Sequence, residues 1–96
     1  MNKEIKHYTP EMARKESKNA FNWRDYIQPY IDKYVSEACK QAKYNATICI
    51  HKPDDFCYND ATEKILEAAR SLGWIAAPSG RTSPGSIYIE LMWDEN

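Results

Sequence analysis

Apolar residues return every three or four positions between residues 23 and 42, which is the spacing of one face of an α-helix. These positions are Trp23, Tyr26, Ile27, Tyr30, Ile31, Tyr34, Val35, Ala38, Cys39 and Ala42. Asn22 precedes them and is suited to accept a hydrogen bond from the first turn as an N-cap. Pro29 lies within the series without shifting its period. We therefore predict one continuous, kinked helix running to Lys43-Tyr44, rather than a helix that begins at Pro29.

Two shorter helices are predicted on either side of this one. Thr9-Pro10-Glu11 begins the first, because a hydroxyl, a proline at the first position and an acidic residue all suit a helix N-terminus. This helix has few apolar positions and ends near Asn19 or Ala20. Asp60 and Glu63 resemble a capping box at the start of the other helix, and Gly73 suits the left-handed residue that closes it. Its buried stripe consists of Ala61, Ile65, Leu66, Ala68, Ala69 and Leu72.

Three segments have the alternating or β-branched composition of strands. Residues 46–51 form the first strand, with Ile48 and Ile50 on one face, and residues 74–77 form a short second strand. Residues 86–93 form the third and clearest strand. One of its faces carries Ile87, Ile89, Leu91 and Trp93, and the other carries Ser86, Tyr88, Glu90 and Met92. Residues 78–85 are rich in Ser, Gly and Pro, which predicts a loop between the last two strands.

The resulting order is α-α-β-α-β-β, which predicts an α+β fold. We expect a three-stranded, mostly antiparallel sheet that is covered on one face by helices. The 96 residues suffice for one domain, with residues 1–8 as a flexible leader and residues 9–96 as the domain. No apolar run approaches the roughly 20 residues of a membrane helix, and the first residues do not have the composition of a secretory signal.

Cysteine content and charge bear on the setting and the class of partner. The three cysteines are odd in number and form no CxxC spacing, which favours a reducing, cytoplasmic compartment. The net charge of −1 argues against a dedicated nucleic-acid binder. However, residues 1–52 hold 10 basic and 6 acidic residues, whereas residues 53–96 hold 3 and 8. Such an asymmetry suits an interaction surface or self-association.

The chain contains few residues suited to catalysis or metal binding. His51, Asp54, Asp55 and Cys57 follow the first strand, but their spacing matches no established metal motif. Cys57 and His51 resemble a nucleophile and its base, although the sequence supplies neither a third, orienting group nor an oxyanion hole. We therefore predict no enzyme activity, no metal and no cofactor. A hydrolase or transferase that uses Cys57 and His51 is the least favoured of the three functions considered.

Five residues are predicted to contact a ligand or partner. Arg81, Thr82 and Ser83 lie in the predicted hairpin loop, where a guanidinium, hydroxyls and backbone N–H groups suit a phosphate or carboxylate. The loop is not a P-loop, because that motif joins a strand to a helix. Tyr88 and Met92 lie on the outer face of the last strand. A single helical layer leaves that face in water, which favours a partner or a second copy of the chain over it.

The overall pattern is similar to that of a group of viral proteins. The opening from Thr9 to Arg14, the strand from Thr47 to Ile50, the Leu72-Gly73-Trp74 end of the third helix and the segment from Gly85 to Trp93 resemble the plan of small uncharacterised proteins of tailed bacteriophages. The resemblance implies a virus-encoded protein in the bacterial cytoplasm. Phage proteins of this size commonly act by stoichiometric binding, and the resemblance supplies no catalytic motif.

The sequence thus favours a non-catalytic binding protein. We expect a phage accessory or anti-defence factor that occupies a host protein or a small anionic ligand, and that forms a homodimer. The alternative is a nucleic-acid-binding module that uses the basic residues of the N-terminal half. Those residues are Lys3, Lys6, Arg14, Lys15, Lys18 and Arg24.

Overall fold

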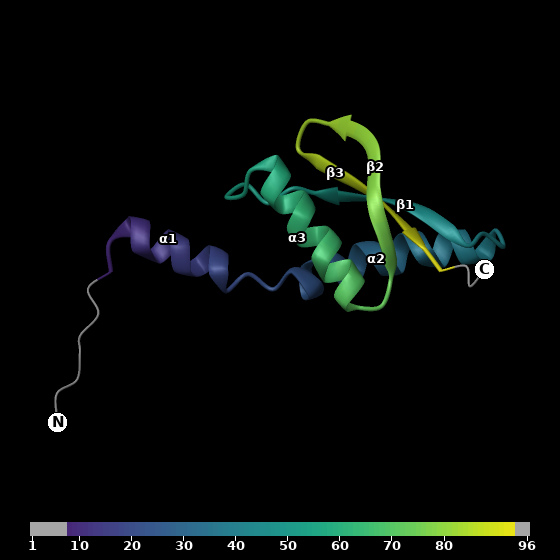
Figure 1. The fold of residues 1–96 in the computed structure, drawn as a ribbon, viewed down its shortest axis with the longest axis horizontal. Coiled ribbons are helices and arrows are strands. Elements are labelled where there is room, and N and C mark those ends of the chain that lie inside the picture. The colour runs from purple at the N-terminus through teal and green to yellow at the C-terminus, as the bar shows by residue number, and fades with distance from the viewer. Residues whose placement is uncertain (1–7, 94–96) are drawn as a thin grey trace, which may run out of the picture.

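The computed structural model describes residues 8–93, without the side chain of Thr82. Within that range the chain forms three helices and three strands in the predicted order, and the α+β class is confirmed. The elements are α1 (Pro10–Asn19), α2 (Trp23–Lys40), β1 (Asn45–His51), α3 (Tyr58–Ser71), β2 (Ile75–Ser83) and β3 (Ser86–Met92) (Figure 1). Apart from Tyr8, the leader predicted for residues 1–8 lies outside the described residues, as do its Lys3, Lys6 and His7.

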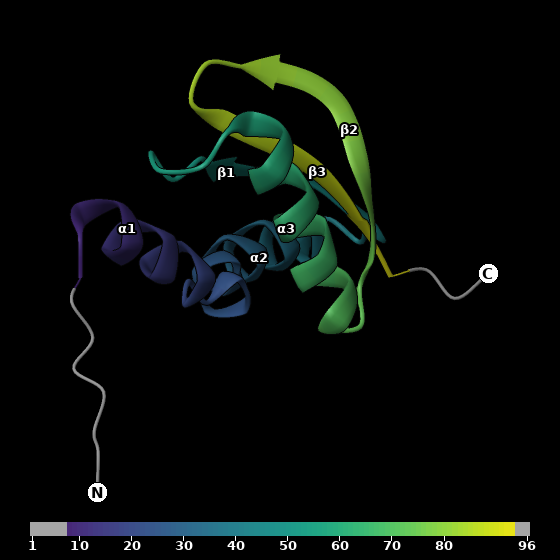
Figure 2. The same cartoon turned by 60° about the vertical axis from the view of Figure 1, so that its left-hand side comes forward.

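The central strand of the sheet is β3, which pairs antiparallel with both β1 and β2. The residues that meet on one face are apolar, since Ile48 lies opposite Ile89 and Ile50 opposite Ile87. α2 packs on β1, α3 packs on β2 and β3, and the two helices contact each other, so they form one layer over that face (Figure 2). The core lies between this layer and the sheet. Its fully buried large side chains are Ile27, Ile31, Ile48, Ile50, Ile65, Ile87, Ile89 and Leu91.

The first two helices begin at the residues predicted to cap them. The Oγ1 atom of Thr9 accepts a 3.1 Å hydrogen bond from the backbone N–H of Met12. The Oδ1 atom of Asn22 accepts one of the same length from the backbone N–H of Asp25. These bonds satisfy N–H groups that have no partner within the helix. α2 continues through Pro29, as its unbroken apolar period predicts.

The predicted end of the long helix is wrong. α2 ends at Lys40, four residues before the predicted end at Tyr44. The reason is a left-handed turn at Ala42, whose φ is 59°. The backbone N–H of Lys43 reaches back to the carbonyl oxygen of Ala38 at 2.9 Å. This hydrogen bond is characteristic of a Schellman motif, which ends many helices. The left-handed position of that motif is usually a glycine.

The predicted start of the third helix is also wrong. α3 begins at Tyr58, and its N-cap is Cys57, whose side chain makes no capping hydrogen bond. Asp60 lies within the first turn, where its charge suits the positive end of the helix dipole. The preceding loop is held by the Lys52 ammonium group, which donates a 2.7 Å hydrogen bond to the carbonyl oxygen of Phe56. Because the loop is held in this way, the chain enters the helix at Tyr58, two residues before Asp60.

The largest departure from the predicted fold lies in residues 78–85. β2 runs through this segment to Ser83, so only Pro84 and Gly85 remain as the hairpin turn. Proline followed by glycine with a φ of 77° is the pattern of a type II turn. The pairing of β2 with β3 is interrupted by a bulge that contains Gly80, whose φ is 83°. Pairing with β3 thus overrides a composition typical of loops.

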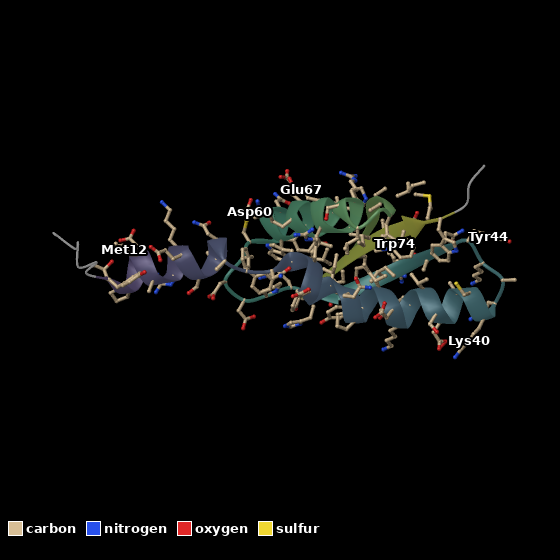
Figure 3. The ribbon with its side chains drawn as sticks, turned by 90° about the horizontal axis from the view of Figure 1, so that it is seen from below. Met12, Lys40, Tyr44, Asp60, Glu67 and Trp74 are labelled. Atoms are coloured by element: carbon tan, nitrogen blue, oxygen red, sulfur yellow. The ribbon has the colours of Figure 1, made fainter. Side chains whose placement is uncertain are left out.

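The helix α1 extends away from the sheet and its helical layer (Figures 1 and 3). None of its residues is buried. Its ten residues are also fewer than the roughly 12–15 that an isolated helix needs for stability in water. The side chains of α1 therefore contribute nothing to the core and remain in contact with solvent.

Candidate functional site

The face of the sheet opposite the helices is not covered by any described element. Tyr88, Glu90 and Met92 of β3 lie along its centre, Cys49 of β1 lies opposite Tyr88, and Ile75 of β2 lies opposite Met92. We call this surface the open sheet face. Ile75 is 55% exposed, and the side chains of Tyr88 and Met92 are half-buried. The face therefore presents apolar side chains to solvent on both sides of Glu90.

Three of the five predicted contact residues lie on the open sheet face. The guanidinium carbon of Arg81 lies 5.3 Å from the centre of the Tyr88 ring, within the range of a cation–π contact. Met92 follows Tyr88 by four positions along β3 and so lies on the same side of the strand. The structure thus joins Arg81 to Tyr88 and places Met92 near one end of the same face.

Thr82 and Ser83 do not lie in a loop. Both belong to β2, with Thr82 opposite Ile87 and Ser83 opposite Ser86 on β3. In a paired strand the backbone groups bond to the neighbouring strand, which leaves fewer N–H groups to receive an anion. Within the described residues, the turn that joins these strands consists of Pro84-Gly85 alone. The anion-binding loop predicted at these positions is therefore not formed.

The residues considered for catalysis or metal binding lie at the surface. Cys57 is exposed at the N-cap of α3, and His51 is exposed at the end of β1. Among residues 8–93, no three His, Cys, Asp or Glu side chains come close enough together to hold a metal ion.

A second surface lies on the helical side, where the connection between α1 and α2 faces α3. It is a groove of about 280 Å³, lined by Lys15, Lys18, Asn19, Phe21, Trp23, Phe56, Asp60 and Lys64. We call it the aromatic groove. Its lining holds three lysines and one acidic residue, so its charge is positive although the chain as a whole carries −1.

Aromatic rings form the wall of this groove. The centre of the Trp23 ring lies 4.6 Å from that of Phe21 and 4.8 Å from that of Phe56. The rings of Phe21 and Phe56 are 5.4 Å apart. Their planes are inclined to each other by 60–67°, as edge-to-face and tilted aromatic pairs prefer. The Nζ atom of Lys18 lies 5.1 Å from the centre of the Phe56 ring, so α1 contacts the cluster through a cation.

No predicted element contains Phe21 or Phe56, because each stands alone outside a periodic segment. A signal for Phe21 exists in the sequence. It precedes the N-cap Asn22, and its ring lies 5.2 Å from that of Tyr26, the fourth residue of α2. An apolar pair at these two positions is a hydrophobic staple, which fixes how the chain enters a helix. Phe56 has no local signal, since its partner rings lie far away in the sequence.

No family model, no curated protein and no solved structure matches the chain. The resemblance to small tailed-phage proteins therefore stays a prediction. Among the described residues, no helix has both the length and the apolar composition needed to cross a membrane.

Tyr26 connects the aromatic groove to the sheet. Its hydroxyl donates a 2.6 Å hydrogen bond to the carbonyl oxygen of His51, the last residue of β1. Burial, followed by the neighbouring Tyr30 and Asp54, raises the pKa of this hydroxyl from 10.0 to about 12. The physical cause is that a phenolate at this position is less well hydrated and lies near other negative groups. The neutral hydroxyl is thus the form that the fold favours.

We expect Tyr26→Phe to lower the free energy of unfolding at neutral pH by about 1 kcal/mol, because it removes the donor to the His51 carbonyl. The advantage of the wild type is expected to shrink as the pH rises from 10 to 12. In that range the unfolded chain loses the Tyr26 proton before the folded chain does, so stability falls with pH.

Urea titrations of wild type and Tyr26→Phe over this pH range measure the effect. The other ionising groups are common to both proteins, so the difference between the two curves isolates Tyr26. Parallel curves between pH 10 and 12 would contradict the role given to this hydroxyl.

Proposed function

We propose that this protein is a non-catalytic binding protein whose open sheet face docks onto another protein. The observation that carries the proposal is the exposed apolar surface of Ile75, Tyr88 and Met92, on both sides of Glu90, on a face that no described helix covers. Protein interfaces are enriched in aromatic residues, methionine and arginine. Tyr88, Met92 and the neighbouring Arg81 supply one residue of each of these types.

A protein fits this face better than a small ligand does. Small molecules bind mainly in concave sites with a few convergent polar groups. The predicted anion-binding loop at residues 81–83 is instead part of β2. A sheet face presents a broad surface, and a surface of this kind suits a partner with an apolar patch of its own.

The sequence pattern indicates where the partner is found and what class of protein it is. Its resemblance to small tailed-phage proteins favours an accessory or anti-defence factor that acts in the bacterial cytoplasm, so that the partner is a host protein. Stoichiometric occupation of a host protein requires no catalytic group, which agrees with the prediction that the chain is not an enzyme.

Capture from a bacterial lysate on immobilised protein tests the proposal. We expect the wild type to retain a host protein in a near one-to-one ratio. The double variant Tyr88→Ala/Met92→Ala is expected to weaken that retention at least tenfold, since central aromatic residues contribute most to interface energy. Leu72→Ala is the matched control, because Leu72 is 39% exposed at the end of α3 on the helical side.

Equal retention by the double variant and the control would contradict the proposal, as would a wild type that retains nothing above background. The mass of the protein in solution tests whether the open sheet face binds a host protein or a second copy of the chain. A dimer that Tyr88→Ala/Met92→Ala converts to a monomer would assign the face to a second copy of the chain instead of a host protein.

A further inference from the structure

We infer that the aromatic groove binds single-stranded nucleic acid. The groove lies on the helical side of the molecule, and the inference does not depend on the partner proposed for the open sheet face. Two observations carry it together: cations from two separate helices converge on the groove, and aromatic rings form its wall. Proteins that bind single strands combine these two features, because cations attract the phosphates and rings stack on the bases.

The positive charge of the groove is assembled from elements that are distant in sequence. Lys15 and Lys18 come from α1, and Lys64 comes from α3. A neighbouring hollow of about 570 Å³ shares Lys64 with the groove and adds Arg24 at the start of α2. The acidic residues in the two linings are Asp60 and Glu67.

The two hollows therefore hold four cations and two anions, in a chain whose net charge is −1. They also share two of the aromatic residues, Phe21 and Trp23. The two hollows, of about 280 and 570 Å³, adjoin each other, since both are lined by Phe21, Trp23 and Lys64. A strand with several phosphates fits them better than a free nucleotide does.

The basic side of α1 continues this positive surface beyond the groove. Lys18 is four positions after Arg14 and three after Lys15, so each of these two residues lies close to Lys18 on the helix surface. No residue of α1 is buried, which leaves its basic side chains outside the core. Figure 3 shows α1 extending past the start of α3, which is marked by Asp60.

The aromatic wall suits unpaired bases. Phe21, Trp23 and Phe56 are half-buried, and the inclined planes of the three rings show that they are not stacked face to face on one another. Every nucleobase has a π-face, so stacking on such rings tolerates many sequences. In a duplex the base faces are already stacked, so the groove favours a single strand.

The sequence alone had left open a nucleic-acid-binding role for the basic N-terminal residues. Of these, Lys15, Lys18 and Arg24 line the two hollows. The structure adds Lys64, which lies in the acidic half of the chain, and joins all four cations to a ring cluster.

The test is fluorescence anisotropy of the full chain with a short fluorescein-labelled oligothymidylate. We expect binding with a micromolar dissociation constant at low salt. The slope of log K against log salt is expected to be about −2 to −3, because each phosphate contact on a single strand contributes roughly −0.7. Unlabelled oligothymidylate should compete, whereas a duplex of the same sequence and thymidine monophosphate should compete at least tenfold more weakly.

Two pairs of variants locate the binding site. Lys15→Gln/Lys64→Gln is expected to weaken binding about tenfold and to reduce the magnitude of the salt slope by roughly 1.4, or about 0.7 for each phosphate contact. Lys33→Gln/Lys40→Gln removes the same charge from exposed positions of α2, and its affinity should stay within about twofold of the wild type. Phe21→Leu should weaken binding about fivefold or more, because leucine does not stack on a base, whereas Phe21→Tyr should retain it.

Thermal unfolding of each variant confirms that it is folded before its affinity is compared. Any one of four results overturns the inference: no anisotropy change at low salt, a salt slope near zero, equal losses in the two lysine double variants, or thymidine monophosphate competing as well as the oligonucleotide. Tyr88→Ala/Met92→Ala is expected to bind oligothymidylate like the wild type. Failure at one surface is therefore distinguishable from failure at the other.

Discussion

Ile89→Ala is expected to lower the free energy of unfolding by about 3 kcal/mol, which lies within the range of roughly 2–5 kcal/mol for a large aliphatic residue in a core. Ile89 is fully buried on the central strand, opposite Ile48 on β1 and Pro78 on β2. Because strands pair with β3 on both sides and helices cover its inner face, little of the resulting cavity can close. For a domain of this size the melting temperature should fall by roughly 12 °C or more, which a circular-dichroism melt measures.

Ile75→Ala is the matched control for this substitution. It removes the same atoms from the same sheet, but Ile75 is 55% exposed on the open sheet face. We expect its effect on the free energy of unfolding to stay below about 0.5 kcal/mol. Similar losses in both variants would show that the two faces of the sheet are wrongly assigned.

The second large effect concerns the turns that close α2 and α3. Ala42 and Gly73 hold the same left-handed position at the ends of these helices, with φ values of 59° and 100°. We expect Gly73→Ala to lower the free energy of unfolding by about 1.5 kcal/mol, because a Cβ strains this backbone conformation. The strain is the sole cause, since an added Cβ meets nothing within 4 Å.

Ala42→Gly is the converse change and should raise the free energy of unfolding by about 0.5 kcal/mol. Glycine relieves the strain at φ = 59°, and its greater freedom in the unfolded chain offsets part of that gain. Urea titration of the two variants measures both effects. Destabilisation by both substitutions would contradict the left-handed turn at Ala42.

The parts of the fold that were predictable are those in which one face of an element is buried. Ile87, Ile89 and Leu91 alternate with half-buried or exposed residues along β3, so the strand and its two faces follow from local spacing. The same holds for α2, where Ile27 and Ile31 are buried four positions apart. Such patterns are local, and tertiary contacts reinforce them.

The extension of β2 was not predictable in this way, because its evidence lies in another strand. Pro78 and Gly80 are unfavourable within strands, but β2 is an edge strand, where proline and bulges are tolerated. The composition of β2 gives no sign of a strand at residues 78–83. These residues nevertheless form one, because the regular strand β3 supplies hydrogen-bonding partners for them. The end of β2 is therefore set by its pairing with β3, whereas the composition of the segment predicts that the strand ends at residue 77.

The two surfaces differ in the same respect. The open sheet face follows from the alternation along β3, so the sequence alone predicts that Tyr88 and Met92 lie on it. The aromatic groove requires Phe21, Phe56 and Lys64 to meet, and these residues belong to three separate segments. The charge pattern pointed to the N-terminal half but gave no means of placing Lys64 beside it.

The two outer strands of the sheet are unequally protected against lateral addition of another chain. The rim formed by β2 carries a proline and a bulge, two devices that hinder a further strand from joining. The rim formed by β1 has neither, and its residues Asn45 to His51 include no lysine or glutamate. A fibril grows only if both edges of a sheet can pair with another chain. Pairing through the β1 edge alone is complete once two copies have associated.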